Sequence, residues 1–362
     1  MTIELINGNS LEVLKTMEDG IIQTCVTSPP YYGLRDYGTA TWVGGDPKCS
    51  HKRDSKWSAK TITGHRNALL AVGDGIYKDV CKVCGAIRND EQIGLETSPE
   101  DYINNLVGLF SEVRRVLKDD GTLWLNIGDS YNGSKPYGST KTKDLIGIPW
   151  MLAFALRADG WYLRQDIIWA KPNPMPESVK DRCTKSHEYI FLLSKSPRYY
   201  FDSVAIEEPA KYDGRKQTKM AGSKKYKDVE YLANGNANSL SVGGRERWRF
   251  KNLQEDGQQP NSFHESRARG EKDKVYAVRN KRDVWFVATK PYKEAHFATF
   301  PQELITPCIL AGSKAGDTVL DPFNGAGTTG LVSKLLGRNY IGIDLNKKYI
   351  ELSKARLDKD GG

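Results

Sequence analysis

The sequence predicts an α/β fold whose doubly wound parallel sheet is assembled from two distant parts of the chain. Segments with the composition of strands alternate with segments of helical periodicity, first up to residue 202 and again from residue 283. A glycine-rich turn lies between a strand and a helix near the C-terminus. Only one βαβ unit is present there, so the other strands must come from the N-terminal half. This implies a circularly permuted order of elements.

The N-terminal half alternates strands and helices. Ser10 is predicted to cap the first helix, which ends before Gly20. Ser98 is predicted to cap the second helix, with Pro99 at its first position. We expect strands within 3–7, 21–27, 121–129, 162–169 and 188–194, and helices within 10–19, 98–120 and 146–159.

Four parts of the chain follow from composition. Residues 1–34 with 98–202 form one half of the predicted α/β domain, and residues 283–362 form the other. Residues 35–97 are rich in Gly, Lys, Asp and Ser and are interpreted as an insertion, and residues 203–282 have few apolar clusters. Within the last part we expect strands at 283–288, 318–321 and 340–344, and helices at 301–312, 330–337 and 347–357.

The glycine-rich turn has the form of a nucleoside-cofactor site. In TVLDPFNGAGTTG, Gly325, Gly327 and Gly330 follow a strand at G-x-G-x-x-G spacing and open a helix. Glycines allow a tight turn and a close approach of the backbone to a ligand. Asp344 ends the next strand, 23 residues after Asp321, where an acidic side chain can bind ribose hydroxyls. The alternative is a structural turn, with Asp344 as a helix cap.

A second unusual turn ends the strand at 21–27, where Ser28, Pro29, Pro30 and Tyr31 follow one another. Two prolines restrict the backbone, so a carbonyl in this turn has a defined direction. The structural alternative is a strand that simply ends in Pro-Pro, with packed tyrosines after it. The segment by itself does not decide between these interpretations.

Together the two turns resemble motifs of the DNA amino-methyltransferases that use S-adenosylmethionine. That family carries (Ser/Thr/Asn/Asp)-Pro-Pro-(Tyr/Phe) and Asp-Pro-Phe-x-Gly-x-Gly-Thr-Thr, which correspond here to residues 28–31 and 321–329. The order of catalytic motif, recognition region and cofactor motif resembles the family's beta ordering. The resemblance implies a circularly permuted, Rossmann-like methyltransferase sheet, S-adenosyl-L-methionine as cofactor and double-stranded DNA as substrate.

The resemblance also implies a mechanism. An exocyclic amine is a poor nucleophile because its lone pair is delocalised into the ring. Hydrogen bonds from the amine to Ser28 and to the carbonyl of Pro29 would free that lone pair for in-line attack on the sulfonium methyl. Tyr31 would stack on a base swung out of the duplex. The expected catalytic set is Ser28, Pro29, Pro30 and Tyr31, and the expected cofactor contacts are Asp321, Pro322, Phe323, Gly325, Gly327, Thr328, Asp344, Phe300 and Pro301.

The target base follows from the resemblance and not from chemistry. Relatives with Ser at the first motif position mostly resemble the cytosine-N4 group, and those with Asp mostly resemble the adenine-N6 group. A neutral hydroxyl at Ser28 suits either amine. We therefore expect N4 of cytosine, with N6 of adenine as the alternative.

Four candidate zinc ligands lie in the insertion, as Cys49-x-His51 and Cys81-x-x-Cys84. The segment CKVCGAIR has the Cys-x-x-Cys-Gly form of a zinc knuckle, whose glycine lets the backbone turn around the metal. A structural Zn²⁺ with four ligands could stabilise a loop that lacks a core of its own. A redox pair or unbound thiols are the alternatives, and His65 is a second candidate for the histidine ligand.

The net charge of +8 comes from one segment. Residues 211–282 hold 18 Lys/Arg and 9 Asp/Glu, so the remainder of the chain is close to neutral. Such charges contact DNA phosphates, and side chains such as Arg245, Arg247 or Arg249 could read base edges. The family has its target-recognition region at this position. A solvated basic loop is the alternative.

Other features narrow the class of protein. There is no run of about 18 apolar residues that could span a membrane, and MTIELINGNS is not a signal peptide. We expect a cytoplasmic protein, associated with the nucleoid, that could have a cognate restriction endonuclease as partner. A nicotinamide-dependent oxidoreductase would leave the Ser28–Tyr31 motif unexplained. A non-enzymatic zinc protein that binds DNA would have no use for the glycine turn.

Overall fold

The computed structural model describes residues 1–33, 37–51, 80–133, 140–210, 278–290 and 300–359. The chain divides into two compact units, which we describe separately. The first comprises residues 1–206 and 282–362, and the second comprises residues 207–281. The described part of the second unit is a short antiparallel pair, β8 (Glu208–Pro209) with β9 (Val278–Arg279). The arginines expected to read DNA lie outside the described residues.

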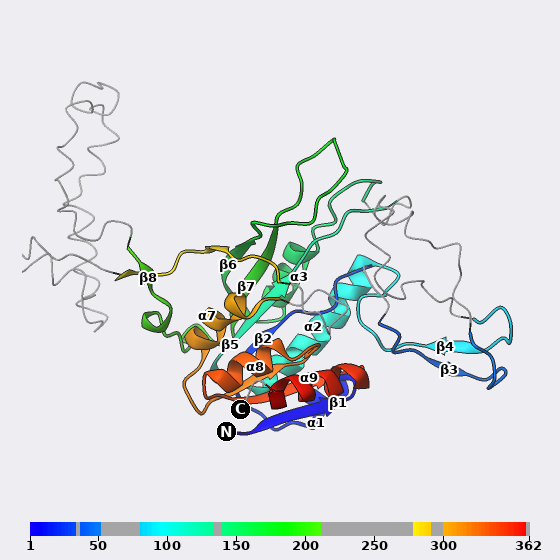
Figure 1. The fold of residues 1–362 in the computed structure, drawn as a ribbon, viewed down its shortest axis with the longest axis horizontal. Coiled ribbons are helices and arrows are strands. Elements are labelled where there is room, and N and C mark those ends of the chain that lie inside the picture. The colour runs from blue at the N-terminus through cyan, green and yellow to red at the C-terminus, as the bar shows by residue number, and fades with distance from the viewer. Residues whose placement is uncertain (34–36, 52–79, 134–139, 211–277, 291–299, 360–362) are drawn as a thin grey trace, which may run out of the picture. The chain divides into compact units, whose positions relative to one another are not determined.

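The first unit is built on one eight-stranded sheet (Figure 1). Its strands lie in the order β1-β12-β11-β2-β5-β7-β6-β10. Strands from the end of the sequence therefore lie between two strands from its beginning. The bounds are β1 Ile3–Asn7, β2 Ile22–Thr27, β5 Leu117–Ile127, β6 Tyr162–Ala170, β7 His187–Ser194, β10 Val284–Phe286, β11 Thr318–Asp321 and β12 Asn339–Asp344.

The sheet is mixed, so the prediction of a purely parallel sheet is wrong for one strand. β7 runs antiparallel to both of its neighbours, β5 and β6, whereas the other described pairs of this sheet are parallel. A parallel neighbour requires a long crossover, usually a helix. No helix is formed between β6 and β7, and the backbone N–H of Lys171 donates to the carbonyl of Ser186 at 2.7 Å to begin the return.

Helices cover both faces of the sheet, as expected for an α/β fold (Figure 1). Leu14, Phe110 and Leu152 belong to the apolar core on one face, and Leu304 and Val332 belong to the core on the other. The first face is covered by α1 (Ser10–Thr16), α2 (Pro99–Val116) and α3 (Ile148–Ala158), and the second by α7 (Gln302–Gly312) and α8 (Thr328–Leu335), with α9 (Lys347–Lys359) packed beside α8.

Helix caps agree with the sequence in one case and differ in another. The Ser98 hydroxyl accepts a hydrogen bond from the Asp101 N–H at 2.9 Å, which confirms the predicted cap of α2. The cap of α1 is Asn9 instead of Ser10, because the Asn9 side chain accepts from the Leu11 N–H at 3.0 Å. The Ser10 hydroxyl donates to the Pro322 carbonyl at 2.5 Å and thus ties α1 to the glycine turn.

Candidate active site

The two sequence motifs meet at the carboxyl edge of the sheet. β2 and β11 are parallel neighbours, so the turns that follow them emerge at the same edge. The Thr27 hydroxyl donates to one carboxylate oxygen of Asp321 at 2.6 Å, and the Thr329 hydroxyl donates to the other at 2.7 Å. Burial raises the pKa of Asp321 to about 6, although these hydrogen bonds favour its charged form. Asp321 thereby holds both turns together, and its oxygens face protein donors.

The structure gives a different reason for glycine at each of the three positions of the glycine turn. A Cβ at Gly327 would lie 2.1 Å from the Ser353 hydroxyl, and one at Gly330 would lie 2.7 Å from the Tyr340 ring. These two glycines let α8 pack closely on α9 and β12. Gly325 has a φ of +48°, and a Cβ there would meet nothing closer than 3.9 Å. The backbone at Gly325 is therefore open on the side where a ligand would approach.

Asp344 lies at the end of β12, next to the glycine turn. Its carboxylate accepts hydrogen bonds from the Gly325 N–H and the Asn346 N–H, both at 2.8 Å. Burial raises the pKa of Asp344 to about 6. The Asn346 side chain, which accepts from the Lys348 N–H at 3.0 Å, caps α9. Asp344 is thus placed at the open part of the turn, where the sequence predicts a ribose-binding carboxylate.

The other expected cofactor contacts are spread around this edge. Phe323 is half-buried against the core on the α1 side. Thr328 is buried, and its hydroxyl accepts from Arg356 of α9 at 3.0 Å. Phe300 and Pro301 immediately precede α7, where Pro301 is buried and Phe300 packs on the second core.

The turn Ser28–Tyr31, which we call the catalytic turn after its expected role, is held from behind by α2. The Tyr102 hydroxyl donates to the Pro30 carbonyl at 2.8 Å. Among the residues that the structure describes, none donates a hydrogen bond to the carbonyl of Pro29. Ser28 is half-buried at the end of β2. The turn therefore fixes the Pro30 carbonyl through the protein, whereas the Pro29 carbonyl has no donor in the described part of the chain.

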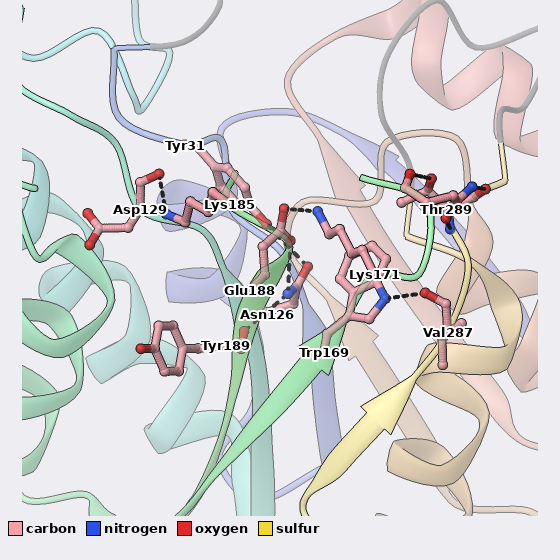
Figure 2. A network of polar contacts seen from close by, with 11 residues as sticks. Tyr31, Asn126, Asp129, Trp169, Lys171, Lys185, Glu188, Tyr189, Val287 and Thr289 are labelled. Atoms are coloured by element: carbon pink, nitrogen blue, oxygen red, sulfur yellow. Dashed lines mark hydrogen bonds and ion pairs between the residues drawn. The ribbon is translucent and has the colours of Figure 1, made fainter. Parts of the chain in front are cut away.

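Tyr31 points into the protein and takes part in a polar network (Figure 2). Its hydroxyl donates to the Glu188 carboxylate at 2.8 Å, and Asn126 is a second neighbour of the hydroxyl at 3.2 Å. A Cβ at Gly128 would lie 2.6 Å from the Tyr31 ring, so the ring packs directly on that glycine. Burial, and then the charge of Glu188, raise the pKa of Tyr31 well above its ordinary value. The expected stacking on a flipped base stays a prediction.

Sequence reasoning missed the residues that surround Tyr31. Lys171 forms an ion pair with Glu188, and its ammonium nitrogen lies 4.3 Å from the centroid of the Trp169 ring (Figure 2). Lys185 donates to the Asp129 carbonyl at 2.7 Å, and burial lowers the pKa of Lys185. The sequence signal for this network was Glu188, a charged residue at the start of the apolar segment EYIFLLS. Glu188 reaches Tyr31 only because β7 runs antiparallel to its neighbours, which the sequence did not indicate.

Comparison with known proteins identifies the family. A family model described as DNA methylase, for enzymes that methylate N6 or N4, matches residues 22–355. The chain belongs to the N6/N4 DNA methyltransferase family. It is an S-adenosylmethionine-dependent DNA amino-methyltransferase, and the oxidoreductase and the non-enzymatic alternatives are excluded.

The relatives of this methyltransferase include site-specific enzymes. It is 39% identical to the Type II methyltransferase M.Cfr9I of Citrobacter freundii, over 98% of this chain and 87% of that one. It is 37% identical to the Type II methyltransferase M.SmaI of Serratia marcescens, over 98% of this chain and 90% of that one. The chain is accordingly a site-specific Type II DNA methyltransferase, a class that belongs to restriction–modification.

Two solved structures share the methyltransferase fold. The cytosine-N4-specific PvuII DNA methyltransferase has a TM-score of 0.56 and 15% identity, covering 99% of this chain and 86% of its own. A structure described as a DNA modification methylase of Thermus thermophilus, complexed with S-adenosyl-L-methionine, has a TM-score of 0.51 and 19% identity. It covers 99% of this chain and 94% of its own.

None of the described helices of this methyltransferase is long and apolar enough to cross a membrane.

The insertion of the methyltransferase brings its four predicted metal ligands together. The ligand atoms of Cys49, His51, Cys81 and Cys84 all lie within 4.8 Å of one another. The Sγ atoms of Cys49 and Cys81 are 3.8 Å apart, and Sγ of Cys84 lies 3.6 Å from Nδ1 of His51. Gly85 has a φ of +71°, and its N–H donates to the Cys81 carbonyl at 2.8 Å. This is the tight turn expected after Cys-x-x-Cys. The alternative ligand His65 lies outside the described residues.

Proposed function

We propose that this methyltransferase modifies N4 of a cytosine that is swung out of the DNA duplex. The proposal rests on Ser28, a neutral hydroxyl beside the Pro29 carbonyl, to which no described residue donates a hydrogen bond. An exocyclic amine has two N–H bonds, which these two oxygens can accept. The hydrogen bonds would favour a tetrahedral nitrogen and localise its lone pair. Serine at this position is typical of the cytosine-N4 group in the resemblance, so cytosine is favoured over adenine.

The carboxyl edge around Gly325 fits the cofactor. Gly325 leaves its backbone open, and the Asp344 carboxylate beside it would accept hydrogen bonds from ribose hydroxyls. Phe323, with Phe300 and Pro301 before α7, would line the same edge. S-adenosylmethionine supplies the methyl group when it is bound. We also infer a circular permutation, because β11 and β12, which flank the glycine turn, are last in sequence yet lie between β1 and β2.

Modified-base sequencing tests this function. The protein is expressed in a bacterial host that lacks DNA methylation, and the genome is read by a method that reports modified bases. We expect N4-methylcytosine at one short recognition sequence. Modification of adenine would assign the N6 alternative, and an unmodified genome despite folded protein would contradict the proposal.

Replacement of Ser28 tests the role of the hydroxyl. Ser28→Ala removes one of the two acceptors for the amine but leaves the residues around Gly325 and Asp344 intact. We expect methylation to be lost while S-adenosylmethionine binding, measured by calorimetry, is retained. Unchanged methylation would refute the assigned role.

We further propose that the cluster Cys49, His51, Cys81 and Cys84 binds one structural Zn²⁺. Tetrahedral zinc with Zn–S bonds of about 2.3 Å places two sulfurs about 3.8 Å apart and a sulfur and a nitrogen about 3.6 Å apart. The observed 3.8 Å and 3.6 Å match these values. Metal analysis of the purified protein should find about one equivalent of zinc. Zinc-free protein would remove this proposal and leave the methyltransferase assignment intact.

Residues 203–282 are proposed as the target-recognition region, on the ground of the excess of basic residues within 211–282. The Type II relatives suggest that a restriction endonuclease with the same recognition sequence accompanies the methyltransferase. The recognition sequence obtained from modified-base sequencing would test this directly. DNA that the protein has methylated should resist a nuclease that cuts at that sequence.

A further inference from the structure

The insertion returns from its Cys/His cluster to the carboxyl edge of the sheet. It does so through two segments, residues 37–40 and residues 89–97. We call residues 89–97 the inner arm. The inner arm follows β4 (Ile87–Asn89), which pairs with β3 (Thr41–Val43) next to the cluster. The two segments contact three loops at that edge, one after β1, one after β2 and one after β12. Two of these loops carry the predicted catalytic and ribose-binding groups.

The inner arm packs against the catalytic turn. The Gly33 N–H donates to the Gly94 carbonyl at 2.9 Å. Gly94 has a φ of +102°, and a Cβ there would lie 3.2 Å from the Tyr31 carbonyl oxygen and 3.3 Å from Cβ of Pro30. The backbone of the arm therefore touches the motif itself, at a position that only glycine fits without strain.

The insertion also contacts the loops beside the glycine turn. Glu91 accepts a hydrogen bond from the Asn9 side chain at 2.9 Å, and Asn9 caps α1. The Tyr37 carbonyl accepts from the Asn346 side chain at 3.2 Å. The backbone N–H of Asn346 in turn donates to the Asp344 carboxylate at 2.8 Å. Asn346 thus links the proposed ribose-binding carboxylate of Asp344 to the insertion.

The described residues of the insertion near the cluster have little apolar packing of their own to hold the inner arm and residues 37–40 in place. β3 and β4 have three residues each, and a two-stranded pair of this kind is marginally stable in water. Val43, Val83 and Ile87 are exposed. At the cluster the Trp42 ring stacks on His51, with centroids 4.4 Å apart, and Ala86 is buried. Metal binding would add four ligand bonds there, beyond polar contacts such as the Arg88–Asp90 ion pair.

We propose that zinc at the Cys/His cluster holds the inner arm against the catalytic turn and holds residues 37–40 against the Asp344 loop, so that metal occupancy sets the affinity for S-adenosylmethionine. This inference rests on the proposed zinc site. Without the metal, residues 37–40 and 89–97 lose their anchor at the cluster, and their contacts with the loops after β1, β2 and β12 are weakened. The buried residues of the two cores lie outside the insertion, and Ile93 of the inner arm packs against the first core from its edge, so the domain stays folded.

The test is a comparison of cofactor binding with and without metal. Full-length protein is measured as purified, after chelator treatment and after Zn²⁺ is restored, with zinc content by elemental analysis and cofactor Kd by calorimetry. We expect Kd to rise about tenfold on zinc removal and to recover on its return. Cys84→Ser should show the weak binding throughout, and Cys183→Ser, which changes an exposed thiol outside the cluster, should behave as wild type.

A second variant separates the arm from the metal. Gly94→Ala leaves all four ligands in place but inserts a methyl group against the catalytic turn. We expect a full equivalent of zinc together with a kcat lowered about tenfold or more. Zinc-loaded wild type that binds the cofactor no better than zinc-free protein would overturn the inference. Methylation of DNA by the loaded protein would in that case still stand.

Discussion

Two carboxyl groups at the carboxyl edge of the sheet have pKa values that burial has raised. Asp321 and Asp344 end the neighbouring strands β11 and β12, and burial raises both pKa values to about 6. Asp321 is surrounded by protein donors, whereas Asp344 keeps a position beside the open Gly325 backbone. We therefore expect the two carboxylates to have different roles, with Asp321 joining the two turns and Asp344 binding the ribose.

The affinity for S-adenosylmethionine should depend on pH through Asp344. A carboxyl with a raised pKa is charged above about pH 6 and becomes protonated below it, and protonation removes an acceptor for the ribose hydroxyls. Cofactor binding should be constant above about pH 7 and weaken by up to about tenfold per unit below pH 6. Calorimetry at several pH values measures this. Asp344→Asn should bind weakly at every pH, and an equally steep decline in that variant would contradict the assignment.

The Tyr31 hydroxyl should matter for rate more than for binding. Tyr31→Phe keeps the ring on Gly128 but removes the hydrogen bond to Glu188, so the catalytic turn loses one of its fixed points. We expect kcat to fall about 10- to 100-fold with little change in KM for either substrate. Tyr32→Phe is the matched control, because the bond of that hydroxyl to the Thr97 carbonyl is long, at 3.4 Å. Equal kinetic effects of the two variants would rule out a special role for Tyr31.

The packing of helices and strands determines how closely these residues approach one another. The glycine turn joins β11 to α8, and its glycines permit contact with Ser353 of α9 and Tyr340 of β12. β7, inserted antiparallel between β5 and β6, brings Glu188 to the same edge as the catalytic turn. The catalytic geometry therefore depends on close packing of helices and on one reversed strand.

The glycine turn gives a stability prediction. Gly327→Ala would place Cβ 2.1 Å from the Ser353 hydroxyl at a φ of +74°, so it should lower the free energy of unfolding by about 1–3 kcal/mol. Gly108→Ala, at an exposed position in α2 where a Cβ meets nothing within 4 Å, should instead raise it by about 0.5–1 kcal/mol. Urea unfolding measures both. A neutral Gly327→Ala would show that α8 and α9 are packed less closely.

The sequence predicted the helices, most strands and both motif turns, because each has a local signal. Ser98 and Pro99 predict the start of α2, and the glycine spacing predicts the start of α8. What it missed depends on non-local contacts. The direction of β7 is settled by pairing with strands on both sides, and the Tyr31–Glu188 bond follows from that pairing. Asn9 caps α1 because Ser10 is engaged by the Pro322 carbonyl, 312 residues away in sequence.

At the scale of the whole molecule, charge and catalysis are separated along the chain. The α/β unit carries the two motifs, and residues 211–282 carry the excess of positive charge. If residues 211–282 bind phosphates, nonspecific attraction to DNA and the chemistry at the base are properties of different segments.

DNA binding should be strongly dependent on salt. If residues 211–282 contact phosphates, the logarithm of the affinity falls linearly with the logarithm of salt concentration. A variant with Arg245, Arg247 and Arg249 changed to Ala should reduce that slope by about one for each lost phosphate contact. Fluorescence anisotropy with a labelled duplex measures the slope. An unchanged slope would place the phosphate contacts elsewhere.

The proposed role of Ser28 in methyl transfer to N4 of cytosine can be tested by mass spectrometry of nucleosides from host DNA that has been exposed to the wild-type protein or to Ser28→Ala. We expect N4-methyldeoxycytidine with the wild type and none with the variant, with both proteins folded and able to bind S-adenosylmethionine. N6-methyldeoxyadenosine as the product, or N4-methyldeoxycytidine from both proteins, would contradict it.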